Sequence, residues 1–223
     1  MRILLALALC ASLAGQTPLA LDIVLLVEDS IPVTNFVSRA DLNDIRPGDR
    51  LAVMTFSNKQ SLKLPLDGDF GKQFRAVHKL DSKGALSTTR LWDAVAKATE
   101  LFDGPRDPSR RRVIFLAFSA EDKASVQTLD TVRAALGRSE AALSAATIWR
   151  SAPASRIPRI SQVPNRTPAP RTPDVLGESA PVSQGSALNA SLVSVDWLVM
   201  ETGGLLQKNE WDFTKFAGHA RSH

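Results

Sequence analysis

The chain has 223 residues and a formal net charge of only +4, from 27 Lys and Arg against 23 Asp and Glu. This length suits one domain with an appendage, and a 44% hydrophobic share with 22% charged residues is ordinary for a globular protein. The composition excludes a chain that is disordered throughout, a fibrous protein and a multi-span membrane protein. The single Cys permits neither a disulfide framework nor a cysteine zinc site.

The N-terminus has the pattern of a secretory signal peptide. Arg2 gives a positive start, residues 3–14 form an apolar run, and Ser12 and Ala14 are the small residues expected before a cleavage site. The run is too short for a membrane span, which takes about 20 residues. We therefore expect residues 1–14 to be removed, leaving a secreted or periplasmic protein without a membrane span. The alternative is a buried N-terminal strand or helix.

Short apolar runs predict the strands of a parallel sheet. Continuous rather than alternating hydrophobicity is typical of strands that are covered on both faces. Four runs have this character: residues 21–27, 50–56, 113–118 and part of 141–149. Residues 61–65 alternate and contain Pro65, which predicts an edge strand paired with the preceding one. Residues 205–207 predict a short last strand.

Between these runs, apolar residues recur at the i, i+3, i+4, i+7 spacing of amphipathic helices. The helices expected from this spacing cover residues 33–40, 70–77, 91–102, 126–136 and 188–199. Candidate N-caps are Asp69, Thr88 or Thr89, and Ser125, and candidate stops are Gly137 and the Gly203-Gly204 pair. This alternation predicts an α/β fold: a doubly wound, mostly parallel sheet with helices on both faces and one antiparallel edge strand.

One segment interrupts the alternation. Residues 151–187 hold seven of the 13 prolines and four Arg against one Asp and one Glu, without apolar periodicity. We expect a flexible or polyproline-like insertion in a single domain formed by residues 15–150 and 188–223. Its surplus of positive charge suits either a basic tether for an acidic partner or a solvated loop.

Several motifs, in order along the chain, resemble those of a von Willebrand factor A-type domain. They are LDIVLLVEDSIP at 21–32, RPGDRLAVMTFS at 46–57, TRLWDA at 89–94, the strand and loop at 111–122, and ETGG at 201–204. The resemblance runs from residue 21 to about residue 223, excluding the insertion, and is closest to the related domains of secreted bacterial proteins. It implies the α/β fold above and a role in binding other proteins.

The resemblance also implies a metal site in altered form. In the family, two Asp, two Ser and a Thr supply oxygen ligands to Mg²⁺ or Mn²⁺ at one edge of the sheet, and an acidic partner residue completes the shell. Here Glu28 stands for the first Asp, and Ser30 and Thr89 are retained. Pro32 replaces the second Ser, and Ser119 replaces the second Asp. The implied degenerate site therefore comprises Glu28, Ser30, Thr89 and Ser119.

With so few ligands left, we expect no cofactor, or only weak binding of Mg²⁺ or Mn²⁺. Asp29, Glu121 or Asp122 could restore a carboxylate ligand. The structural alternative is that Ser30 and Thr89 act as loop or helix caps and that Glu28 is a solvated loop acid.

We expect a non-enzymatic protein-interaction domain of adhesion or scaffold type whose partner is an unidentified protein. Its binding surface would include Asp29, Pro32, Glu121 and Asp122 at the carboxyl edge of the sheet, where ligands of open α/β sheets bind. The alternatives are a Mg²⁺- or Mn²⁺-dependent binding module and an uncharacterised α/β enzyme. No P-loop, G-x-S-x-G or G-x-G-x-x-G motif follows a strand. The four Trp do not form a spaced stacking platform, so we expect no nucleic-acid partner.

The run Arg110-Arg111-Arg112 directly precedes a buried strand. Three consecutive guanidinium groups could attract phosphate, but at this position they predict a solvated strand entrance.

Overall fold

The computed structural model describes residues 19–31, 44–69, 88–102, 104–119, 122–148, 184–208 and 211–222. The expected signal peptide, the helices expected over residues 33–40 and 70–77, and most of the 151–187 segment lie outside these ranges. The statements below concern the described residues.

Six strands form one sheet in the order β3-β2-β1-β4-β5-β6. β3 pairs antiparallel with β2, and the other neighbouring strands pair parallel. The mostly parallel sheet and its antiparallel edge strand are thus confirmed. The strands are β1 (Ala20–Glu28), β2 (Arg50–Phe56), β3 (Gln60–Asp67), β4 (Arg110–Phe118), β5 (Ala141–Thr147) and β6 (Leu206–Lys208).

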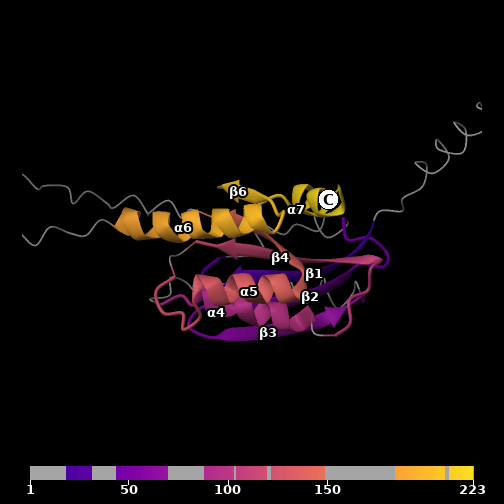
Figure 1. Ribbon diagram of the computed structural model, residues 1–223, viewed down its shortest axis with the longest axis horizontal. Coiled ribbons are helices and arrows are strands. Elements are labelled where there is room, and N and C mark those ends of the chain that lie inside the picture. The colour runs from indigo at the N-terminus through magenta and orange to yellow at the C-terminus, as the bar shows by residue number, and fades with distance from the viewer. Residues whose placement is uncertain are drawn as a thin grey trace, which may run out of the picture.

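Helices cover both faces of the sheet, as expected (Figure 1). One face packs against α4 (Leu91–Thr99), its 3₁₀ extension η2 (Glu100–Phe102), α5 (Leu129–Ser139) and α6 (Gln184–Glu201). The other face packs against α7 (Phe213–Ser222). There the rings of Phe213 and Phe216 both lie 5.2 Å, centroid to centroid, from the ring of Phe115 on β4. The apolar surface of β1, β2, β4 and β5 is therefore buried from two sides, which explains their continuous hydrophobicity.

Helix boundaries differ from the sequence expectations. α5 begins at Leu129, with the Thr128 hydroxyl accepting a hydrogen bond from the Thr131 N–H, and not after Ser125. It also continues past Gly137, because glycine lowers helix propensity without preventing helical geometry. α6 begins at Gln184, within the segment expected to be an insertion.

The Gly203-Gly204 pair ends α6, as expected, and brings the chain close to β5. Gly203 has a left-handed φ of 68°, which favours glycine. A Cβ on Gly204 would lie 1.8 Å from the carbonyl oxygen of Leu143. Beside it the Leu143 N–H donates to the Thr202 hydroxyl at 2.9 Å. Only a residue without a side chain fits at position 204.

The three arginines at the start of β4 bond to neighbouring parts of the protein, whereas the sequence predicted a solvated strand entrance. Arg110 pairs with Asp22 on β1. Arg111 donates to carbonyl oxygens in α7 and in the turn after α6, and Arg112 donates to carbonyl oxygens at the end of α5 and in the loop after η2. All three guanidinium groups satisfy acceptors at the amino edge of the sheet.

Asp22 is the acidic centre of that edge. Its carboxylate accepts hydrogen bonds from the Nε atoms of Arg50 and Arg110 at 2.8 and 2.7 Å, and its side chain is only 5% exposed. Burial raises the pKa of Asp22, but the hydrogen bonds from the two guanidinium groups outweigh it and hold the pKa below 3.8.

We predict that Asp22→Asn destabilises the protein in a pH-dependent way. Because the folded-state pKa is lowered, the stability from the ionised Asp22 is present above about pH 4 and is lost as the pH falls through the folded value. The urea midpoint of the variant should lie below that of wild type at about pH 6, and the gap should narrow on acidification. A gap that stays constant down to about pH 2 would contradict this role of Asp22.

We predict that Gly204→Ala lowers the free energy of unfolding by about 2–3 kcal/mol, because the added methyl group meets the Leu143 backbone. Urea denaturation measures the change. The control is Gly137→Ala, where an added Cβ has nothing within 4 Å. That control should leave stability unchanged or raise it by about 0.5 kcal/mol, since alanine is the better helix former. Equal effects of the two substitutions would refute the close approach.

Candidate functional site

Three of the four residues expected in the degenerate metal site contact one another at the carboxyl ends of β1 and β4. One carboxylate oxygen of Glu28 accepts from the Ser30 hydroxyl at 2.6 Å. The other oxygen accepts from the Ser119 N–H at 2.6 Å and from the Ser119 hydroxyl at 3.3 Å. The two serine hydroxyl oxygens lie 3.0 Å apart. In this Glu28–Ser30–Ser119 cluster Glu28 is 1% exposed and Ser30 is buried, while Ser119 is half-buried, so Glu28 is not a solvated loop acid.

The fourth residue, Thr89, lies in the loop before α4 at the same edge. It is 2% exposed, and its carbonyl oxygen accepts from the N–H groups of Lys123 and Ala124 at 3.0 and 3.3 Å. The next N–H, that of Arg90, donates to the Ser57 carbonyl oxygen at 2.9 Å. Main-chain hydrogen bonds therefore fasten together the loop after β2, the loop before α4 and the loop after β4.

The residues expected on the binding surface lie at this edge where the structure describes them. The Asp29 N–H donates to the carbonyl oxygen of Phe56, and its carboxylate accepts from the Ser57 hydroxyl at 3.2 Å. Asp122 accepts from the Leu91 N–H at 2.9 Å. Pro32 and Glu121 lie outside the described residues.

The start of α4 is capped from the loop after β4, and not by Thr88 or Thr89. The N-cap residue Arg90 makes no side-chain capping bond. Instead the Ser125 hydroxyl accepts from the N–H groups of Trp92 and Asp93 at 3.0 and 3.2 Å. In return the Asp93 carboxylate accepts from two N–H groups of that loop at 2.9 and 2.8 Å. The roles of Ser57 and Asp93 and the capping of α4 by Ser125 were not predicted from the sequence, because their partners are far away along the chain.

The geometry does not fit a divalent ion as it stands. Mg²⁺ and Mn²⁺ need several oxygen ligands with lone pairs directed at one point. Here both Glu28 oxygens already accept hydrogen bonds, and the Ser30 hydroxyl donates to one of them. Among the residues that the structure describes, no group of three or more His, Cys, Asp and Glu side chains is placed to hold a metal.

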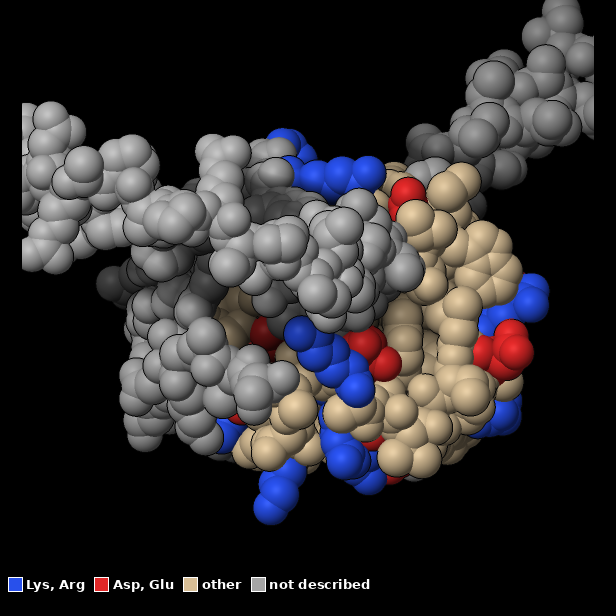
Figure 2. Space-filling model, turned by 90° about the vertical axis from the view of Figure 1, so that its left-hand side faces the viewer, with Lys and Arg blue, Asp and Glu red and all other residues tan. Residues whose placement is uncertain are grey.

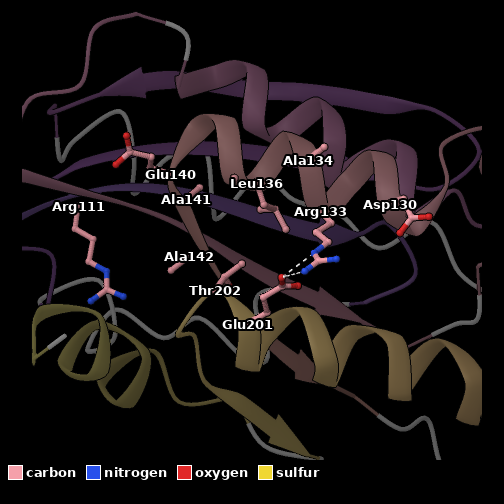
Figure 3. A pocket seen from close by; sticks show the side chains of 11 residues that line it. Arg111, Asp130, Arg133, Ala134, Leu136, Glu140, Ala141, Ala142, Glu201 and Thr202 are labelled. Carbon is pink, nitrogen blue, oxygen red and sulfur yellow. Dashed lines mark hydrogen bonds and ion pairs between the residues drawn. The ribbon is translucent and has the colours of Figure 1, made fainter.

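A cavity of about 670 Å³ lies away from this edge, between α5 and the C-terminal end of α6 (Figure 3). Its floor includes Ala141 and Ala142 at the start of β5, so it opens near the amino edge of the sheet. The Arg133–Glu201 ion pair spans it from helix to helix, and the Arg133 guanidinium lies 4.8 Å from the centroid of the Trp197 ring. The cavity is therefore remote from the Glu28–Ser30–Ser119 cluster, and its lining includes Arg111 of the three-arginine run and Glu201 of the ETGG motif.

Comparisons with known proteins support the fold. No protein-family model and no curated protein matches the chain. The structure is similar to that of an aerotolerance-related membrane protein from Bacteroides fragilis, with 11% identity over 91% of this chain and 97% of that chain, and a TM-score of 0.55. It is also similar to the conserved hypothetical protein BatB from Bacteroides thetaiotaomicron, with 10% identity over 90% and 96% of the chains, and a TM-score of 0.54.

Two further similarities are weaker. The SpRpn10 VWA domain gives 14% identity over 89% of this chain and 93% of that chain, with a TM-score of 0.48. Proximal thread matrix protein 1 from the mussel byssus gives 13% identity and a TM-score of 0.45 over 60% of this chain, which spans only 39% of that protein. Identities this low show the fold alone. The strand order and the similarity to the two Bacteroides structures agree with the doubly wound α/β fold that the motifs implied.

None of the described helices is long and apolar enough to cross a membrane.

We predict that Glu28→Gln lowers the free energy of unfolding by about 2 kcal/mol, because the amide keeps only one acceptor oxygen for donors that now bond to a carboxylate. Equilibrium unfolding in urea measures this change. Ser119→Ala, which keeps the N–H donor and removes only the hydroxyl, should cost about 1 kcal/mol or less. If Glu28→Gln were as stable as wild type, the cluster would not hold the two strand ends together.

Proposed function

We propose that this chain is a secreted or periplasmic, non-enzymatic protein-interaction domain of adhesion or scaffold type. It binds a protein partner through the loops at the carboxyl edge of its sheet, and it does so without a metal ion. The signal-peptide pattern of residues 1–14 supports export.

The observation that carries the proposal is the Glu28–Ser30–Ser119 cluster. A bound cation would join the loop after β1 to the loop after β4 by attracting oxygens from both. Here the Glu28 carboxylate joins the same two loops by accepting hydrogen bonds at 2.6 Å from Ser30 on one and from Ser119 on the other. The edge is therefore held in place by the chain itself, which removes the structural need for an ion.

The arrangement of the loops also favours binding over catalysis. The strand order reverses around β1, which places its carboxyl end in the crevice where open α/β sheets bind ligands. The acids there, Asp93 and Asp122, accept hydrogen bonds from main-chain N–H groups of neighbouring loops. Carboxylates occupied in this way order a surface, whereas a general acid or base must exchange its proton with a substrate.

We predict that a photo-crosslinking amino acid at position 58, in the loop between β2 and β3, captures a specific protein in the native host. The same amino acid at position 138, exposed at the end of α5 near the amino edge, serves as the control and should capture none. The adduct at position 58 should form equally with and without EDTA, and mass spectrometry identifies it. Failure of position 58 to give an adduct beyond the control would count against the proposed surface.

Metal dependence is tested on the same protein. Calorimetric titration of wild type with Mg²⁺ and with Mn²⁺ should give no saturable heat. A saturable heat that Thr89→Ala abolishes, together with an EDTA-sensitive adduct, would replace the proposal by the metal-dependent alternative.

A further inference from the structure

Four acidic side chains that the structure describes at the carboxyl edge accept hydrogen bonds from the protein itself. Glu28 and Asp29 accept hydrogen bonds from serine hydroxyls. Asp93 and Asp122 accept from main-chain N–H groups across the gap between two loops. A carboxylate that accepts such bonds is oriented toward its donors. Of these four acids Glu28 is buried, whereas Asp29, Asp93 and Asp122 are partly exposed and engaged in hydrogen bonds within the edge.

The basic side chains at the same edge remain available. Lys59 and Lys123 are exposed, and neither forms an ion pair within the described part of the chain. The Arg90 side chain is 40% exposed, its only acidic neighbour there is Asp93 at 3.6 Å, and its Nε–H has no acceptor among the described residues. An unpaired buried N–H is costly, so an incoming acceptor is favoured near this guanidinium.

The three cations lie on loops that are bonded to one another. The Ser57 N–H donates to the Lys59 carbonyl oxygen, and the Ser57 carbonyl oxygen accepts from the Arg90 N–H. The adjacent Thr89 carbonyl oxygen accepts from the Lys123 N–H. Figure 2 shows this end of the molecule, where Lys and Arg side chains project from the described surface and acidic atoms are visible between them. The main-chain ties fix the relative positions of the three backbone segments from which these side chains project.

Resting on the proposed function, we infer that the partner presents an acidic peptide segment whose carboxylates are received by Lys59, Arg90 and Lys123. The cations of the chain thus take the place that a metal ion would have in recognising an acid. Val126, which is 77% exposed three residues after Lys123, adds an apolar contact at the rim of the same surface. The partner segment therefore combines Asp or Glu with an apolar side chain.

A peptide fits this surface better than a nucleic acid. Duplex binders neutralise roughly six to ten phosphates, whereas this edge offers three cations close to the carboxylates of Asp29 and Asp93. The net charge of the whole chain is only +4. A short segment with a few carboxylates matches the number of cations, and a polyphosphate backbone would exceed it.

The test measures binding of a fluorescein-labelled peptide of about ten residues that contains several Glu and one Leu, against a matched peptide with Gln in place of Glu. Fluorescence anisotropy at about 50 mM salt should show binding of the Glu peptide to wild type. The double variant Lys59→Glu/Lys123→Glu should bind at least about tenfold more weakly, because two attractions become repulsions. Arg138→Glu, a charge reversal near the opposite edge, should change the affinity by less than about twofold.

Equal binding of the Glu and Gln peptides, an unchanged affinity of the double variant, or stronger binding of single-stranded DNA of matched charge would each overturn the acidic-partner inference. The photo-crosslink at position 58 separates this failure from failure of the proposed function. An adduct that forms equally in wild type and in the double variant would leave the binding surface standing and remove only the acidic recognition. Loss of the adduct in the double variant, with its urea midpoint unchanged, is the expected result.

Discussion

The structure of the carboxyl edge depends on one buried carboxylate. Glu28 is 1% exposed, and a charge with so little access to water is tolerated only when hydrogen bonds replace its hydration. Ser30 and Ser119 supply those bonds, and because they belong to different loops, satisfying Glu28 also fixes the end of β1 relative to the end of β4. The need of one buried carboxylate for hydrogen bonds thus positions the loops that meet at the centre of the carboxyl edge.

The same principle extends outward from Glu28. Asp122 and Ser125 satisfy the first N–H groups of α4, and Asp93 on α4 satisfies N–H groups of the loop that carries them. Helix ends leave such N–H groups without partners, so reciprocal capping by a distant loop orders both elements at once. Among the described residues of this edge, these acids accept hydrogen bonds from neighbouring loops, whereas Lys59 and Lys123 are exposed and form no ion pair. The proposed preference for an acidic partner follows from where the carboxylates point.

Sequence reasoning succeeded where a residue's environment follows from its neighbours along the chain. Continuous apolar runs located the buried strands, Pro65 marked the edge strand, and Gly203-Gly204 marked the end of α6. It failed at the helix caps, since Ser125 bonds to N–H groups more than 30 positions earlier in the chain. It also took the arginines at 110–112 for a solvated entrance, because their acceptors lie at helix ends that only folding brings close.

The sequence by itself determined the α/β fold. Hydrophobic periodicity and glycine positions are visible among residues close together in the chain, so they predict strands and helices without knowledge of tertiary contacts. The resemblance of its motifs to a von Willebrand factor A-type domain also grouped Glu28, Ser30 and Ser119 at one edge of the sheet. Only the tertiary structure shows the hydrogen-bond partners of these residues, since the sequence does not say whether a glutamate in a degenerate metal motif binds an ion or accepts hydrogen bonds. In the structure Glu28 accepts hydrogen bonds of 2.6 Å from the Ser30 hydroxyl and from the Ser119 N–H. Packing sets the directions of side chains that meet from distant parts of the chain, and local sequence patterns do not predict these directions.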